Sequence, residues 1–354
     1  MRLTALQVAS KRRVDFVIDM VRLANFGPLA SVEWSSLGKL NLVIGENGAG
    51  KTFLLKTLYA VVRSLEMFGR GDERQSSISE ILARKLYWTF QADKIGDLVS
   101  KGSRNPLSFE ALVNGRKIAF QFGRDTSKQI ISELYDATPL EGNSVFLPAK
   151  EVLSLHHIIL KSREVDQLFG FDDTYFDLAK VLNINPTKDK NFPEFAASRK
   201  NLRELLGGRM EYDEADHRWT FKKGNEKYAL GIIAEGVKKL AILDTLLGNR
   251  YLSPQSIVFI DEVEAALHPK AISVFLDVLA LLAERGIQFF MATHSYFVLK
   301  KLLLISRTKG ISIPILSSSG GVWTTGDLAD GMPDNPIVDE SVRLYEEQVE
   351  LSLG

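Results

Sequence analysis

The chain has 354 residues, of which 45% are hydrophobic and 25% charged, proportions typical of a globular protein with a sizeable core. It contains no cysteine, which excludes disulfides, thiolate catalysis and metal sites built on cysteine. Its 44 basic and 44 acidic residues cancel, which disfavours a globally basic nucleic-acid binder. No apolar run is long enough to cross a membrane and the N-terminus lacks the order of a signal peptide, so we expect a cytoplasmic protein without membrane contact.

The N-terminal part of the chain predicts strands around a glycine-rich turn. Residues 51–68 have the apolar spacing of a helix, and the polar residues 69–77 are expected to form a loop. Asn114-Gly115 lies between two β-rich runs and predicts a hairpin over 107–122. Further strands are expected at 14–21, 31–36, 39–45 and 143–149.

The second half of the chain changes character twice. Residues 151 to about 206 predict a few short helices, and residues 209–230 predict short strands joined by turns. Strands at 256–262 and 287–295 then alternate with helices at 236–247 and 269–284. From Gly310 we expect loops and one surface helix over 338–350. The alternation favours a mostly parallel sheet covered by helices on both faces.

The strongest motif directly follows a short apolar strand. It matches the phosphate-loop pattern G-x-x-x-x-G-K-[ST] and comprises Gly45, Glu46, Asn47, Gly48, Ala49, Gly50, Lys51 and Thr52. Glycines allow the tight turn whose N–H groups cradle phosphate oxygens, and the N-terminus of the following helix favours anions. Lys51 is expected to neutralise the β- and γ-phosphates, and Thr52 is expected to bind Mg²⁺.

Two further strand ends carry side chains that suit the same site. Asp261 and Glu262 follow an apolar strand, where Asp261 is expected to hold Mg²⁺ and Glu262 to polarise the attacking water. His294 follows the next strand and is placed to reach a γ-phosphate. Alone, an Asp-Glu turn or a single histidine is more often structural. Their order after the phosphate loop is what favours a catalytic role.

The order of these motifs resembles the head of ATP-binding-cassette ATPases, and more closely the SMC/RecF/OLD branch. The loop matches G-x-N-G-[AS]-G-K-[ST], IDEVEAALHPKA is similar to D-E-x-E-x-x-L-H-P, and ATHS is similar to the switch-histidine segment. The tail is similar to stand-alone ATPases of bacterial antiphage defence cassettes, such as Septu-type proteins and OLD relatives. The resemblance implies an α/β P-loop NTPase fold, with a mixed sheet flanked by helices and a helical insertion.

The resemblance also implies a division of the chain. The nucleotide-binding core would begin with 1–150, which holds the phosphate loop and a β-rich insert, and would resume at 231–315. Residues 151–230 would form a helical lobe, and 316–354 a tail with a surface helix. The two parts of the core would bring the three motifs to one site.

In this family two heads sandwich two ATP molecules, and the signature helix of each head caps the γ-phosphate bound by the other. LGIIAEGVKKLAILDTLL is similar to the region of that helix, so Gly236 is expected to act in trans. Ala234 stands where a serine is expected, and L-S-G-G-Q is absent. The glutamine expected before the helical lobe is absent too, which leaves either Lys150 or Glu151 to meet the nucleotide.

The resemblance therefore implies an ATPase that uses ATP and Mg²⁺ and forms ATP-driven homodimers or higher oligomers. With no effector domain in view, its implied role is to regulate a separately encoded effector, for example a nuclease or a toxin, in an antiphage defence system. The alternative is a nucleotide-dependent clamp on nucleic acid or a scaffold, in which ATP binding alone is the signal. A clamp would use local basic clusters, namely Lys11-Arg12-Arg13, Arg199-Lys200 with Arg203, and Lys222-Lys223 with Lys227.

Overall fold

The computed structural model describes residues 18–127, 130–132, 138–184, 192–213, 216 and 218–353. Its helices are α1 Lys51–Met67, α2 Ile78–Phe90, α3 His156–Glu164, α4 Asp173–Leu182, α5 Ala196–Leu206, α6 Glu235–Gly248, α7 Pro269–Glu284, α8 Tyr296–Lys309 and α9 Pro336–Leu353. Its strands are β1 Ile18–Phe26, β2 Leu29–Trp34, β3 Leu40–Gly45, β4 Leu107–Val113, β5 Arg116–Phe122, β6 Ile131–Ser132, β7 Ser144–Leu147, β8 Arg209–Asp213, β9 Arg218–Lys223, β10 Glu226–Ala229, β11 Ile257–Ile260, β12 Gln288–Thr293, β13 Pro314–Ser319 and β14 Val322–Asp327.

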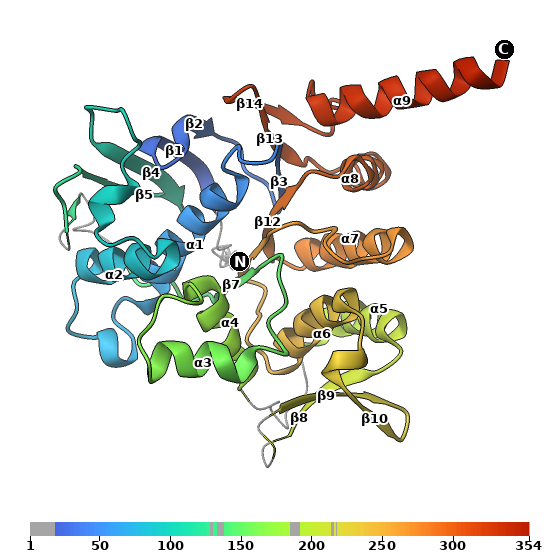
Figure 1. Cartoon of the computed structure of the whole chain (residues 1–354), viewed down its shortest axis with the longest axis horizontal. Coiled ribbons are helices and arrows are strands. Elements are labelled where there is room, and N and C mark those ends of the chain that lie inside the picture. The colour runs from blue at the N-terminus through green and yellow to red at the C-terminus, as the bar shows by residue number, and fades with distance from the viewer. Residues whose placement is uncertain are drawn as a thin grey trace, which may run out of the picture.

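A mixed sheet at the centre of the molecule has the strand order β14-β13-β3-β12-β11-β7. Its neighbouring strands are parallel from β13 to β7, and β14 runs antiparallel at one edge. Figure 1 shows α6, α7 and α8 on one face of this sheet and α1 on the other. The expected α/β fold, with a mixed sheet flanked by helices, is therefore confirmed. Parallel pairing also brings the carboxyl ends of β3, β11 and β12 to one edge.

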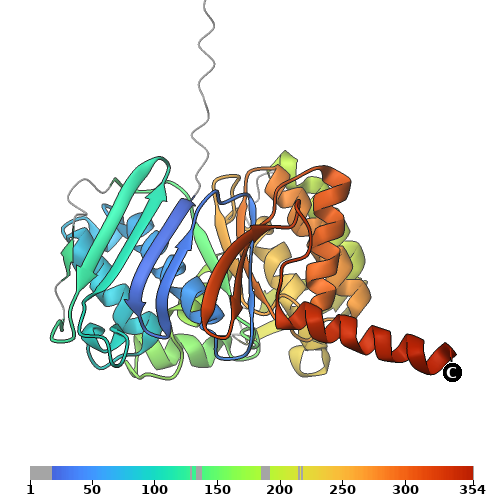
Figure 2. The same ribbon diagram turned by 90° about the horizontal axis from the view of Figure 1, so that it is seen from above.

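A second, antiparallel sheet has the order β2-β1-β4-β5-β6 and packs against α1 and α2. Figure 2 shows it beside the central sheet. In β4, buried residues alternate with half-buried ones, as expected for a strand with one covered face. The Trp34 ring meets the Phe290 ring of β12 edge-on, with centroids 5.8 Å apart. The helix that follows the phosphate loop is thus held in one apolar core shared by two sheets.

The helices expected after residue 151 are present as α3, α4 and α5, and the short strands expected after them form a sheet with the order β10-β9-β8. α4 packs against β7 and α6, which joins this region to the central sheet. Lys56 of α1 donates to Asp172, the N-cap of α4, at 2.6 Å. The phosphate-loop helix therefore has a direct polar contact with the helical region.

Four elements depart from the predicted pattern. The loop expected over 69–77 ends in a capping box, in which Ser77 and Glu80 exchange hydrogen bonds and start α2. α8 follows His294, and β13 with β14 occupies a stretch expected to be loops. The serines of β13 make the strand look like a loop in the sequence. Ser317 can nevertheless be buried, because its Oγ accepts from Asn335 at 2.9 Å.

The last helix, α9, projects away from the body of the molecule (Figure 2). It confirms the expected surface helix and extends it to Pro336–Leu353, and none of its described residues is buried. Its exposed apolar side chains include Tyr345 and Leu351, which are 66% and 80% exposed. No helix in the described ranges is long and apolar enough to cross a membrane.

Candidate functional site

The phosphate loop connects β3 to α1 at the edge where the parallel strands end. Gly50 is the N-cap of α1 and has φ 100°, in the left-handed region that favours glycine. A Cβ at this position would lie 2.7 Å from Leu29 Cδ2, so the site also lacks room for a side chain. Glu46, Asn47 and Gly48 are exposed at the crest of the loop. The loop therefore presents backbone to solvent at the start of a long helix.

Lys51 is folded back over this loop. Its Nζ donates to the carbonyl oxygens of Gly45 at 2.7 Å and Glu46 at 2.9 Å, and the residue is 8% exposed. Burial lowers the pKa of Lys51, and the nearby carboxylates of Asp261 and Glu262 oppose that shift. A cation held at the mouth of the loop, beside two acidic residues, is placed to receive phosphate oxygens.

Thr52 and Asp261 meet directly across the site. The Thr52 hydroxyl lies 3.0 Å from both carboxylate oxygens of Asp261, and Asp261 N donates to Leu147 O of the adjoining β7 at 3.0 Å. Burial raises the pKa of Asp261, while the hydrogen bond from Thr52 acts against the rise. A hydroxyl and a carboxylate are hard oxygen ligands, which is the donor set that Mg²⁺ prefers.

Glu262 begins the turn after β11 in a conformation that non-glycine residues seldom adopt. Its φ is 45°, and its carbonyl accepts from Ala265 N at 2.9 Å. The carbonyl also accepts from Lys239 Nζ at 2.6 Å, and the same ammonium lies 3.2 Å from Asp261 O. Burial lowers the pKa of Lys239 to about 8. Lys239, which the sequence analysis missed, thus clamps the backbone that presents both acidic side chains.

His294 is joined to the acidic turn through Glu264. Glu264 Oε2 accepts from the Thr293 hydroxyl at 2.7 Å, and Oε1 accepts from His294 N at 3.1 Å. The His294 Nδ1 atom lies 3.5 Å from Glu264 Oε1, and the imidazole is 47% exposed. Glu264 belongs to the D-E-x-E segment, but its role becomes visible only when the ends of β11 and β12 are side by side. It holds both the backbone and the imidazole of His294 beside the acidic turn.

Gly236 lies in the first turn of α6 and is buried against its own chain. A Cβ there would lie 2.5 Å from Ala266 O, so glycine lets the helix approach the turn that follows Glu262. Its neighbours Ala234 and Glu235 are exposed. The structure therefore connects the start of α6 with the acidic turn of the same chain, and the trans role of Gly236 stays a prediction.

Comparison with known protein families identifies the family to which this chain belongs. Residues 40–300 match the family described as "AAA domain, putative AbiEii toxin, Type IV TA system". The chain belongs to this AAA domain family. The match spans the phosphate loop, the acidic turn and His294, so all three motifs of this AAA domain protein lie inside it. No curated protein sequence matches the chain.

Three solved structures to which the chain is similar are distant from it in sequence. The SMC head domain from Thermotoga maritima is 15% identical with a TM-score of 0.44, covering 88% of this chain and 98% of that one. A Pyrococcus furiosus SMC head bound to the C-terminal domain of ScpA is 13% identical with a TM-score of 0.49, covering 94% and 99%. The recombination mediator RecF is 15% identical with a TM-score of 0.43, covering 88% and 98%. Likeness at this level supports no functional argument.

The two candidates for the missing glutamine of the AAA domain protein differ in their surroundings. Both carboxylate oxygens of Glu151 accept from Ser154 N, at 2.9 and 3.0 Å, and Oε2 lies 4.0 Å from Lys238 Nζ. Lys150 is exposed. Glu151 is thus committed to its own loop, which leaves Lys150 as the side chain with more freedom to move.

Two of the three basic clusters contain ion pairs. Arg199 is buried and its Nε donates to Asp244 Oδ1 at 2.8 Å, and Arg203 shares the same carboxylate at 3.3 Å. Lys222 and Lys227 both face Glu211, at 3.7 and 3.9 Å. The cluster Lys11-Arg12-Arg13 lies outside the described residues. These ion pairs weaken the electrostatic case for the nucleic-acid clamp.

Proposed function

We propose that this AAA domain protein is an Mg²⁺-dependent ATPase. The observation that carries the proposal is the contact of Thr52 with Asp261 at 3.0 Å, directly beside Lys51 at the end of the phosphate loop. These groups come from α1 and from the end of β11, two elements that only the folded sheet brings together. Their donor types match the phosphates and the cation of Mg²⁺-ATP.

The residues fit a cation that arrives with its nucleotide. Among the described residues, no group of three or more histidine and acidic side chains forms a metal cage. Mg²⁺ usually keeps several waters and binds through one or two protein ligands plus substrate phosphates. Thr52 and Asp261 would hold it, and the ion when bound would neutralise part of the phosphate charge.

Each remaining side chain has a separate task in the proposed reaction. Lys51 leaves the carbonyls of its loop and pairs with the β- and γ-phosphates. Glu262 accepts a hydrogen bond from the attacking water and orients it towards phosphorus. His294 contacts the γ-phosphate. Glu264 holds the histidine in place, because its Oε1 accepts from His294 N at 3.1 Å. The loop amides and the N-terminus of α1 stabilise the charge on the transferring phosphoryl group.

We also propose that ATP joins two such heads and that the dimer regulates a separately encoded effector. The sequence resemblance supports the dimer, with the start of α6 at Gly236 meeting the partner's ATP. The family description names a putative toxin of a type IV toxin–antitoxin system, and a two-component system is compatible with a separately encoded partner. Co-expression with the product of the neighbouring gene tests this part. Absence of both a complex and any change in that product's activity would contradict it.

The first experiment is the solution mass of Glu262→Gln, measured by light scattering with and without Mg²⁺-ATP. This change keeps the shape of the side chain but removes the base, so it should slow turnover about 100-fold or more while ATP still binds. We expect a monomer without ATP and a dimer with it. Unchanged mass with bound ATP would contradict ATP-driven dimerisation, and unchanged turnover would contradict the role of Glu262.

A further inference from the structure

A cavity with charged and apolar lining residues lies near the opposite end of α1 from the phosphate loop. Its volume is about 420 Å³, within the range of small-molecule sites. Helices α1, α2, α3 and α4 and the segment before β11 supply its walls. Lys51 and Arg63 are about 18 Å apart along the helix at 1.5 Å per residue, so this cavity is separate from the phosphate loop.

Basic side chains outnumber acidic ones in the described lining of the cavity. The cations are Arg63, Arg84, Lys85, Arg163 and Lys180. They face two lining carboxylates, Asp173 and Asp177. Lys85 Nζ sits between these two, 2.9 Å from Asp173 and in contact with Asp177. Two carboxylates cannot neutralise five cations, which leaves the cavity with a positive potential.

Some of this positive charge is already balanced outside the cavity. Arg63 Nη1 donates to Glu66 Oε2 at 2.9 Å, and Arg84 pairs with Glu73. Arg163 Nη2 lies 3.0 Å from Asp173 Oδ1, inside the cavity. For Lys180, the described contacts include the Phe176 ring but no carboxylate within 4.0 Å. An excess of one to three positive charges remains for a ligand to meet.

Two buried donors on the cavity wall have no acceptor among the described residues. These are Arg63 Nε and Arg163 Nη1. Arg63 Nε lies 3.9 Å from an Asp177 carboxylate oxygen, which is too distant for a hydrogen bond. A buried donor without an acceptor is costly, and native structures seldom leave one without a reason. Both atoms are covered by protein, so an anion in the cavity would act on these guanidinium groups through its charge and not by a hydrogen bond to either atom.

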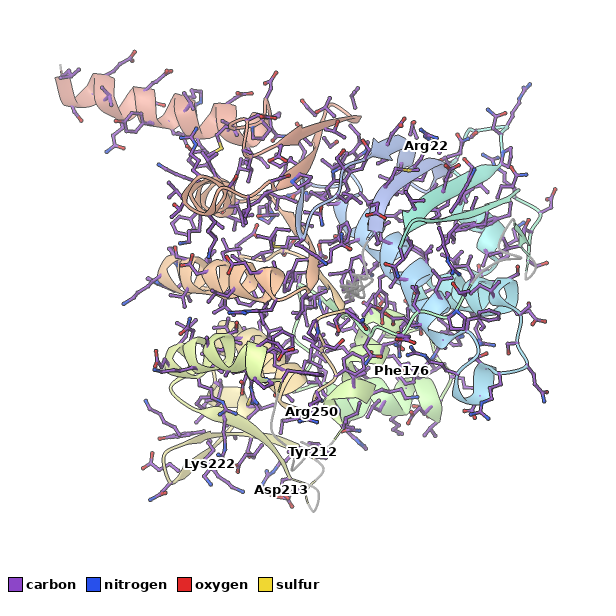
Figure 3. All side chains as sticks on the ribbon, turned by 180° about the vertical axis from the view of Figure 1, so that it is seen from behind. Arg22, Phe176, Tyr212, Asp213, Lys222 and Arg250 are labelled. Atoms are coloured by element: carbon purple, nitrogen blue, oxygen red, sulfur yellow. The ribbon has the colours of Figure 1, made fainter. Side chains whose placement is uncertain are left out.

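The rest of the lining indicates what else the anion carries. The Phe176 ring of α4, labelled in Figure 3, lies 5.4 Å from both the Arg163 guanidinium carbon and Lys180 Nζ. Met67 and Ile81 add apolar surface from the facing helices. Planar guanidinium groups suit phosphate oxygens, and an aromatic ring suits a flat organic group. The cavity thus combines a phosphate-type end with an apolar wall.

We propose that this cavity binds a small organic phosphate of about mononucleotide size. The ligand would join α1 and α2 to α3 and α4, because its cationic partners come from all four helices. The proposal does not depend on ATP hydrolysis at the phosphate loop.

The test uses the full chain carrying Lys51→Ala, which silences the phosphate loop, and measures calorimetric binding of AMP, pyrophosphate and inorganic phosphate. Arg84→Glu with Lys180→Glu, both at exposed positions, reverses charge at the cavity without disturbing the core. Lys200→Glu on α5, 76% exposed, is the control for a charge reversal elsewhere. We expect one AMP per chain, tighter than inorganic phosphate, weakened at least tenfold by the paired change and unchanged by the control.

Three results would overturn the proposal. The first is no binding of any of the three probes to a variant whose circular dichroism shows a native fold. The second is equal AMP affinity with and without the paired change, which would place AMP elsewhere. The third is equal affinity for AMP and inorganic phosphate, which would remove the role of the apolar wall around Phe176.

Discussion

The two ends of α1 show two ways of arranging positive charge in one molecule. At its start, consecutive residues turn the backbone towards solvent, and the hydrogen bonds of Lys51 within the described part of the chain go to carbonyls of its own loop. Near its end, Arg63 and Lys85 belong to a network of side chains from separate helices. The first arrangement leaves its cation free to change partners. In the second, the same ion pairs that shape the cavity also hold the helices together.

Lys85→Met should have the largest effect on stability. Lys85 is 4% exposed and neutralises Asp173 and Asp177, so its loss leaves two buried carboxylates without their shared cation. We expect the free energy of unfolding to fall by about 3–5 kcal/mol, measured by urea denaturation. Lys117→Met, which removes a 57% exposed partner of Glu110, should cost less than about 1 kcal/mol. Equal losses of unfolding free energy in the two variants would contradict the expected difference between buried and surface ion pairs.

Lys51→Ala should have a large effect on turnover and a small effect on stability. It removes the main cation of the phosphate loop, so turnover should fall about 100- to 1,000-fold in a phosphate-release assay. The free energy of unfolding should change by less than about 1 kcal/mol, because the two carbonyls it contacts can accept from water instead. A large loss of stability would show that the two ends of α1 are built alike.

Gly236→Ala tests how closely α6 must approach the acidic turn. The new Cβ would lie 2.5 Å from Ala266 O, so the helix or the turn has to move. We expect a loss of about 1–3 kcal/mol in unfolding free energy together with slower turnover. Gly231→Ala is the matched control, since nothing lies within 4 Å of its added Cβ. If both variants behave as wild type, the contact does not position the turn.

Lys239→Met should reveal itself in the pH dependence of stability. Burial lowers the pKa of Lys239 from 10.5 to about 8, so the unfolded chain binds the proton more tightly than the folded one. The stability that this residue contributes is therefore present above pH 10.5 and is lost as the pH falls through about 8. Between pH 8 and 10, wild type should gain about 1 kcal/mol per pH unit relative to the variant. Lys200→Met, at an exposed position, tests for a general effect of removing a lysine. If the unfolding free energies of wild type and Lys239→Met changed with pH in parallel, the lowered pKa of Lys239 would be contradicted.

Local signals in the sequence predict much of the fold. α7 begins at Pro269, where the fixed φ of proline suits the first turn, and His268 caps it by accepting from Lys270 N. The Asn114-Gly115 turn joins β4 and β5 as expected. α2 was missed, because the polar run before it conceals the Ser77 cap. β13 was missed too, because its buried serines depend on Asn335, a partner that no periodicity reveals.

The same limit applies to the site. The phosphate loop and Asp261 are contiguous motifs with a fixed meaning, so the sequence alone predicts their meeting. Lys239 and Glu264 act through contacts between elements that are distant in the chain, and each looks like an ordinary charged residue until burial is known. The charges around the cavity are harder still, since they come from four helices and form no motif.

The projecting helix α9 has a practical consequence. Within the described part of the chain none of its side chains is buried, and the whole sequence contains no cysteine. Ser352→Cys would therefore introduce a unique thiol, at an exposed position far from the phosphate loop along the chain. A donor or acceptor dye attached there would report the separation of two heads in real time by energy transfer. The helix thus offers a labelling position for following assembly by fluorescence without changing the core.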